Sequence, residues 1–295
     1  MMQKIFIILL LVVSVSCKTK KEEHAEVQKE EIHKPSVLLE RFAYNAKDQP
    51  IISVHRGGKG IKHYPENSLE TLKYINDSIE AIYEIDVAKT KDSILVLMHD
   101  NTLNRTTTGE GNITDFTFAE LQVFNLEDDF GNETKFKIPL FKDVLEWAKV
   151  NAVVLTIDIK RGVDVEQVVA LIREVGAEDV SVIITYDLRQ AERANAAAPE
   201  LLLSVSARND KEFEWLLHSG IPTENMLAFT GTRMSSDSLY NKIHNNGIKT
   251  ILGTLGNLDK QAEARGDSLY KVWVANGIDV IATDRPFAVA SILQK

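Results

Sequence analysis

The sequence predicts one (β/α)8 barrel of the TIM type, with a small hairpin and insertion after the second strand. From residue 51 onward, short runs rich in β-branched residues alternate with amphipathic stretches of helical period. This alternation is typical of a parallel sheet that is covered by helices. One gap between two runs is too short for a parallel crossover, which needs a dozen or more residues. If this gap is a hairpin turn, eight parallel strands remain.

Nine segments have the composition of buried strands. They are 51–55, 82–87, 94–99, 153–159, 180–185, 201–206, 226–230, 250–254 and 279–283. The stretches between them carry helix-stop signals: DVEQVVALIREVG ends at Gly176, and LRQAERANAAA is followed by Pro199.

The short gap lies between Val87 and Ile94 and holds only AKTKDS. A turn centred on Asp92 and Ser93 would place Asp86 opposite His99 across the hairpin. Residues 100–138 show no βα repeat, so we expect an insertion of about 88–138 on this end of the barrel.

The N-terminus has the layout of an export signal. Lys4 precedes an apolar run, 5–15, that is short for a membrane span, and the chain's one cysteine, Cys17, follows. This resembles the lipobox of bacterial lipoproteins, with Ser14 where leucine is usual. We therefore expect a signal peptide over 1–17 with a lipidated Cys17. The alternative is an ordinary signal peptide with a chance cysteine.

Three parts follow from this interpretation. Residues 18–36 are charged and lack aromatic residues, which predicts a flexible tether. Residues 37–295 would form a single catalytic barrel domain. The protein would be exported and held by its lipid anchor on a membrane, facing the periplasm or the cell surface.

The composition narrows the choice of ligands. The chain has 295 residues, 44% of them hydrophobic and 26% charged, with a formal net charge of −9. This is a normal globular composition without the basic footprint of a nucleic-acid-binding protein. An acidic protein that binds a phosphate needs a local cationic cluster or a metal ion.

Chemically useful side chains follow several predicted strands, where barrel enzymes place their catalytic groups. These are His55 and Arg56, Glu84 and Asp86, His99 and Asp100, Asp158 and Lys160, and Asp284 and Arg285. Three carboxylates suit one Ca²⁺ or Mg²⁺ ion. Two histidines can act as general acid and base, while arginine and lysine bind phosphate. The combination suits phosphodiester cleavage.

The motifs HRGG, YPENSLETL, YEIDVAKTKDSILVLMHDNTLNRTT and IATDRP resemble the glycerophosphodiester phosphodiesterase family over about residues 50–290. The resemblance implies a (β/α)8 barrel and hydrolysis of small glycerophosphodiesters to glycerol 3-phosphate and an alcohol. It implies these roles: His55 and His99 as the catalytic acid–base pair, Glu84, Asp86 and Asp158 as ligands of one divalent metal ion, Arg56 and Lys160 on the phosphate, and Glu66 and Asn67 at the glycerol end.

The chain departs from the family pattern in places. Asp158 stands where glutamate is commoner, and Ser93 replaces a turn glycine. The segment TILGTLGN (250–257) lacks the tryptophan usual there, which indicates a differently built substrate wall.

Three other functions fit these residues less well. A phospholipase acting on intact lipids would need an exposed apolar rim, and the insertion's phenylalanines are interspersed with acids. A non-catalytic binding lipoprotein would be expected to lack a histidine or an acidic ligand. A glycosidase would need a carboxylate pair without such basic neighbours.

Overall fold

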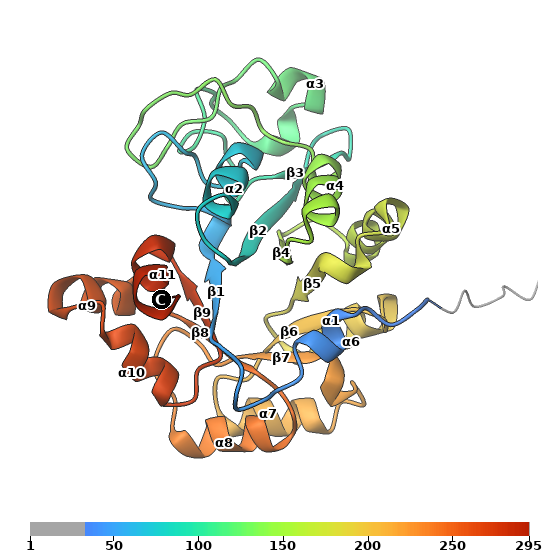
Figure 1. The fold of residues 1–295 in the computed structure, drawn as a ribbon. Coiled ribbons are helices and arrows are strands. Elements are labelled where there is room, and N and C mark those ends of the chain that lie inside the picture. The colour runs from blue at the N-terminus through green and yellow to red at the C-terminus, as the bar shows by residue number, and fades with distance from the viewer. Residues whose placement is uncertain (1–32, 295) are drawn as a thin grey trace, which may run out of the picture. The chain divides into compact units, whose positions relative to one another are not determined.

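The computed structural model describes residues 33–294, so the predicted signal peptide, Cys17 and most of the predicted tether lie outside the described residues. Nine strands form one sheet in the order β1-β9-β8-β7-β6-β5-β4-β2-β3, and β1 also pairs with β2. This last pairing closes eight parallel strands into a barrel ringed by helices (Figure 1). The predicted fold class is confirmed.

The strands are β1 Ile51–Val54, β2 Ile82–Lys89, β3 Leu95–Leu97, β4 Leu155–Ile159, β5 Ser181–Ile184, β6 Leu202–Ser206, β7 Met226–Phe229, β8 Thr250–Gly253 and β9 Val280–Thr283. The α-helices are α1 Leu38–Arg41, α2 Leu69–Asn76, α3 Phe118–Leu121, α4 Phe141–Asn151, α5 Val165–Val175, α6 Leu188–Ala197, α7 Asp210–Leu217, α8 Asp237–Asn245, α9 Asn257–Arg265, α10 Leu269–Ala275 and α11 Pro286–Leu293. Four 3-10 helices complete the set: η1 His55–Gly57, η2 Ile113–Asp115, η3 Glu178–Val180 and η4 Thr223–Asn225.

All nine predicted strands are present, but the predicted register of the hairpin is wrong by one residue. Strand β3 runs antiparallel to β2 with Val87 opposite Leu97, and the Met98 N–H donates to the Asp86 carbonyl at 3.0 Å. Asp86 therefore lies opposite Met98 and not His99. The reason is a three-residue loop in which Ser93 adopts the left-handed conformation (φ 64°), whereas the prediction assumed a turn of even length.

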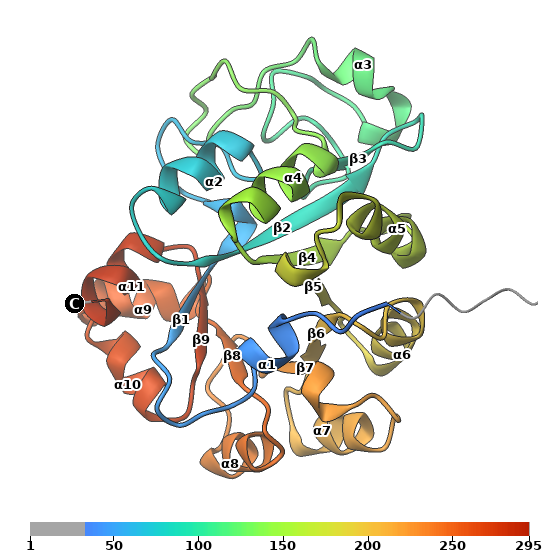
Figure 2. The same cartoon turned by 45° about the vertical axis from the view of Figure 1, so that its right-hand side comes forward.

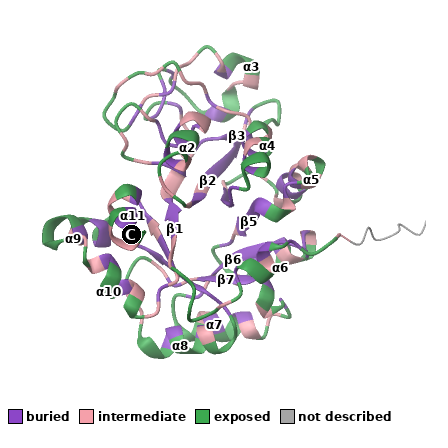
Figure 3. Ribbon diagram, viewed as in Figure 1, coloured by how far each residue is buried: buried purple, intermediate pink, exposed green. Residues whose placement is uncertain are grey.

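Two apolar layers stabilise the barrel. The larger lies between the strands and the surrounding helices, whose buried faces turn toward the sheet (Figure 3). The smaller fills the barrel near the amino-terminal ends of the strands, where residues such as Ile82, Leu202 and Val280 pack against Leu38 and Phe42 at α1. Helix α1 therefore covers this end of the barrel (Figure 2), which leaves the opposite, carboxyl end for the functional side chains.

The insertion after β3 has a small core of its own. Buried residues that include Met98, Leu103 and Leu126 pack against partly buried phenylalanines, among them Phe116 and Phe124.

Within residues 33–294, no helix combines the length and apolarity needed to cross a membrane.

Candidate active site

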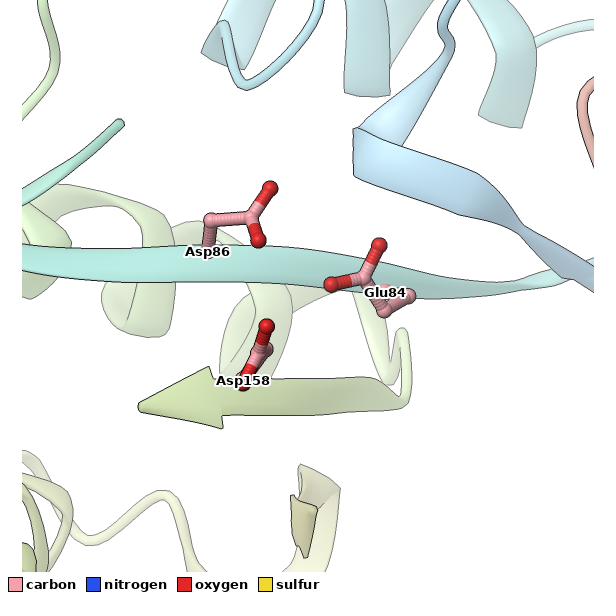
Figure 4. A group of neighbouring side chains, drawn as sticks. All are labelled: Glu84, Asp86 and Asp158. Atoms are coloured by element: carbon pink, nitrogen blue, oxygen red, sulfur yellow. The ribbon is translucent and has the colours of Figure 1, made fainter. Parts of the chain in front are cut away.

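Three carboxylates converge at the carboxyl end of β2 and β4. The parallel register of these strands pairs Asp86 with Asp158, and Glu84 lies two residues before Asp86 on the same face. One oxygen of each side chain lies within 4.8 Å of the others (Figure 4). The sheet register therefore brings the three predicted metal ligands together.

Burial gives this cluster an unusual charge environment. Asp86 is 1% exposed and Asp158 5% exposed. Burial and the neighbouring Asp86 raise the pKa of Glu84 well above its usual range. Burial also raises the pKa of Asp158, although the positive charge of Lys160 opposes this effect. Packed buried carboxylates of this kind fit a divalent cation, because the ion supplies the charge that stabilises their ionised forms.

Lys160 and Asn67 contact the acidic cluster directly. The Lys160 ammonium donates to Asp86 Oδ1 and to Asp158 Oδ2, each at 3.1 Å. The Asn67 side-chain amide donates to Asp86 Oδ2 at 2.7 Å, and its oxygen accepts from the Asp86 N–H at 3.0 Å. Asn67 thus fixes the side-chain rotamer of Asp86, one of the candidate metal ligands.

The loop that joins β1 to α2 adopts a constrained backbone. Arg56 and Asn67 both have positive φ (51° and 54°), and the Asn67 N–H donates to the Arg56 carbonyl at 2.7 Å. Gly58 has φ 130°, and a Cβ there would lie 2.4 Å from Thr71 Cγ2. The strained backbone aims the Arg56 N–H at Glu84 Oε2, at 2.7 Å.

His55, at the end of β1, pairs with a carboxylate from the neighbouring strand. Its Nδ1 lies 2.6 Å from Asp284 Oδ1, and its Nε2 lies 4.0 Å from Glu84 Oε2. Burial opposes ionisation of Asp284, but the hydrogen bond with His55 and the positive charges of His55, Lys59 and Arg56 together outweigh it and lower the pKa of Asp284. The buried Asp259 accepts from the Asp284 N–H at 2.8 Å. His55 therefore presents Nε2 toward the acidic cluster.

His99 pairs with the next residue in the chain. Its Nδ1 lies 2.6 Å from Asp100 Oδ1, while its Nε2 lies 2.6 Å from Arg56 Nη2. A carboxylate only accepts and a guanidinium only donates, so the proton of this ring is on Nδ1 and the lone pair on Nε2. In this structure His99 is a neutral imidazole in a defined tautomer.

Glu66 binds two arginines. Its side chain is 3% exposed and accepts from Arg56 Nη1 at 3.1 Å and from Arg105 Nη2 at 2.7 Å. The resemblance placed Glu66 and Asn67 at the glycerol end of the site. In this structure their side chains contact Arg56, Arg105 and Asp86.

A pocket of about 400 Å³ adjoins the cluster. His55, Glu84 and Tyr186 line its inner side, and Phe229 and Leu255 are among the apolar residues of its wall. Leu255 comes from the segment that lacks the family tryptophan, so an aliphatic side chain forms part of the wall there.

Sequence reasoning gave no role to Arg105 or Tyr186. Two features of the sequence could have indicated their roles. Arg105 belongs to the LNRTT motif, and Tyr186 follows β5 at the same end of the barrel as the other site residues. Burial and the charge of the neighbouring Asp158 raise the pKa of the Tyr186 phenol. Both side chains help to build the site.

The closed barrel, with acidic, imidazole and cationic side chains gathered at its carboxyl end, defines a TIM-barrel enzyme of the phosphodiesterase class. The Glycerophosphoryl diester phosphodiesterase family matches residues 55–257, and the chain belongs to this family.

Similar proteins agree with this assignment. A crystal structure of a glycerophosphoryl diester phosphodiesterase from Parabacteroides distasonis has 32% sequence identity and a TM-score of 0.82, covering 87% of this chain and 90% of that one. A glycerophosphodiester phosphodiesterase from Caldanaerobacter subterraneus is 25% identical over 253 residues, which is 83% of this chain and 98% of the relative. One from Bacillus altitudinis is 41% identical over 96 residues, 32% of this chain and 38% of the relative.

Proposed function

We propose that this protein hydrolyses glycerophosphodiesters to glycerol 3-phosphate and an alcohol, with one divalent cation and with His55 and His99 as the acid–base pair. One observation supports this most: two carboxylate-paired imidazoles are linked to the three-carboxylate cluster at one end of the barrel. His55 Nε2 lies 4.0 Å from Glu84, and Arg56 connects His99 to Glu84. The activity named for the relatives from Caldanaerobacter subterraneus and Bacillus altitudinis is consistent with it.

Glu84, Asp86 and Asp158 would hold the cation, either Ca²⁺ or Mg²⁺, because both prefer carboxylate oxygens. When bound, the cation would supply charge neutralisation at the phosphate and make a bound hydroxyl or water more acidic. Asn67 would keep Asp86 in its ligating rotamer.

The two histidines would move the protons. Each ring has Nδ1 on a carboxylate, which leaves Nε2 to accept a proton from the attacking hydroxyl or to give one to the departing alkoxide. The carboxylates Asp284 and Asp100 orient the rings and stabilise the imidazolium form when it arises.

Arg56 and Lys160 would bind the phosphate. In this structure the Arg56 guanidinium contacts His99, and the Lys160 ammonium donates to the acidic cluster. A phosphate that lies between His99 and the acidic cluster can accept hydrogen bonds from both Arg56 and Lys160. Its negative charge would draw Arg56 away from His99 Nε2. Substrate binding would then free the lone pair that a base needs.

We also propose that the chain is exported and anchored through a lipid on Cys17. Lys4, the apolar run 5–15 and Cys17 support this proposal at the level of sequence alone. Metabolic labelling with a fatty acid should label the wild-type protein but not the Cys17→Ser variant, and equal labelling of the two would contradict it.

Product analysis tests the proposed reaction. The purified protein is incubated with glycerophosphoethanolamine, -choline, -glycerol and -inositol, and glycerol 3-phosphate and the free alcohol are measured. Equimolar release of both from at least one substrate is the expected result. Hydrolysis of only intact phospholipids, or release of glycerol instead of glycerol 3-phosphate, would contradict the proposal.

A further inference from the structure

Five side chains, the imidazole of His99 among them, form a closed ring of contacts. His99 Nδ1 contacts Asp100 Oδ1 at 2.6 Å, and Arg105 Nε donates to Asp100 Oδ2 at 2.7 Å. Arg105 also donates to both oxygens of Glu66, at 2.7 and 3.1 Å. Glu66 accepts from Arg56 Nη1 at 3.1 Å, and Arg56 Nη2 returns to His99 Nε2 at 2.6 Å. Arg105 is the member that joins the two carboxylates.

The charges of this ring balance with a neutral imidazole. Two guanidinium groups face two carboxylates, and Glu66, with its side chain 3% exposed, receives hydrogen bonds from both arginines. The hydrogen bond from Arg105 is the main cause of the low pKa of Asp100. Without Arg105, Glu66 and Asp100 would share one cation, Arg56, which contacts only the first of them.

We propose that Arg105 is a positioning residue: through Asp100 it fixes the ring orientation and tautomer of His99, and through Glu66 it fixes the place of Arg56. Its guanidinium suits this because one planar group can bind two carboxylates at once, which a lysine ammonium does with poorer geometry. The consequence for turnover rests on the proposed function, whereas the consequence for the tautomer of His99 does not.

A purely structural role for Arg105 makes a different prediction. Arg105 Nη1 also lies 3.7 Å from Asp129 Oδ1, so the side chain could simply hold the insertion in place. In that case its removal would lower the stability of the fold, and neither the tautomer of His99 nor rescue by a small cation would follow.

Three variants separate these roles: Arg105→Ala, Arg105→Lys and a matched control, Arg193→Ala. Arg193 makes a similar paired contact with Glu166, at 2.7 and 2.9 Å, on exposed helices outside the ring. The chain has seven histidines, and loss of a signal in His99→Gln assigns His99 in ¹⁵N spectra of histidine-labelled, Mg²⁺-loaded protein. Turnover and thermal stability are measured on the same samples.

We expect Arg105→Ala to lower kcat on the order of 10–100-fold with a melting temperature close to the control's, since small misplacements of reacting groups cost about this much. Free guanidinium should restore part of kcat in this variant and none in Arg193→Ala. Arg105→Lys should lose less, and it carries the test if the alanine variant does not fold. In the spectra, His99 should change from a single Nδ1–H tautomer to a mixture.

Two results would overturn the proposal: an unchanged His99 tautomer in a folded Arg105 variant, or a loss of kcat that follows the loss of stability and is not rescued. If the wild type releases no glycerol 3-phosphate, the proposed function fails, and the spectra alone decide the role of Arg105.

Discussion

The two histidine–carboxylate pairs have the same distance and different supports. His55 directly follows β1 and Asp284 directly follows β9, two strands whose register pairs Val54 with Thr283, so the closed sheet positions both residues. His99 and Asp100 are consecutive residues after β3. An ion pair from Arg105 of the insertion and a hydrogen bond from Arg56 of the β1–α2 loop hold them. Groups held on strands are positioned more rigidly than groups held on loops. The barrel pair is therefore fixed by the fold, and the insertion pair by charge.

Removing either imidazole would have the largest effect and would show whether both pairs act in the same reaction. His55→Ala and His99→Ala should each lower kcat by about 10²–10⁴-fold, as expected for loss of a general acid or base. Steady-state kinetics and metal-binding measurements on both variants check this. If one variant keeps the wild-type kcat, the histidine replaced in it does not act in the reaction.

Changing the carboxylates would sharpen the comparison between the pairs. Asp284→Asn should lower kcat on the order of 10²-fold, because the amide can donate to Nδ1 and thus favours the wrong tautomer of His55. Asp100→Asn should lower it on the order of 10-fold, because Arg56 Nη2 donates to Nε2 before substrate binds and so favours the native tautomer of His99 in the free enzyme. The reverse order of the two effects would mean that the barrel does not position its histidine–carboxylate pair more firmly than the insertion does.

The support of the barrel pair can be tested through Asp259. This buried side chain accepts from Tyr270 Oη at 2.9 Å, from Thr283 Oγ1 at 2.9 Å and from the Asp284 N–H. Asp259→Asn should lower the free energy of unfolding by about 1–3 kcal/mol, since buried donors lose their acceptor. Denaturant melts check this, with Tyr270→Phe as the control that removes one donor and should cost less.

Acid should loosen the insertion side first. Burial opposes ionisation of Asp128, but hydrogen bonds from the His63 N–H and from Asn132 outweigh it and lower the pKa of Asp128 to about 2. Its pKa in the unfolded chain is about 3.9, so its stabilising contribution is complete above that value and is lost as the pH falls toward about 2. The bond at 2.6 Å to the His63 N–H ties the β1–α2 loop to the insertion.

Hydrogen exchange of the His63 amide between pH 4 and 2 measures this smaller effect. In the wild type, protection of the His63 amide from exchange, relative to the barrel amides, should decrease as the pH is lowered from 4 to 2. In Asp128→Asn this protection should be low at every pH in that range. Equal protection in the two proteins would mean that Asp128 does not hold the loop.

The sequence allowed the barrel and much of the site to be predicted because both depend on local pattern. Buried strands are visible as β-branched runs, and a spacing of two residues places Glu84 and Asp86 on one face. The hairpin register was missed because a left-handed Ser93 adds a residue to the loop.

The partners of the loop residues could not be predicted in the same way. The contact between Glu66 and Arg105 spans 39 residues and depends on how the insertion folds over the β1–α2 loop. No periodicity marks such a pair, so Arg105 had no predicted role and the contacts of Glu66 with the two arginines were not predicted. The His99–Asp100 pair and the charged residues that hold it are therefore the part of the site that is hardest to predict from the sequence pattern.

The most direct test of the account is a metal titration with turnover followed in the same sample. The protein is stripped with a chelator, Ca²⁺ or Mg²⁺ is added back stepwise, and bound metal and released glycerol 3-phosphate are measured together. We expect no glycerol 3-phosphate release from the stripped protein and recovery of turnover in proportion to one bound ion per chain. Asp86→Asn should lose both metal binding and turnover. Full turnover by the stripped protein, or bound metal without any turnover, would contradict it.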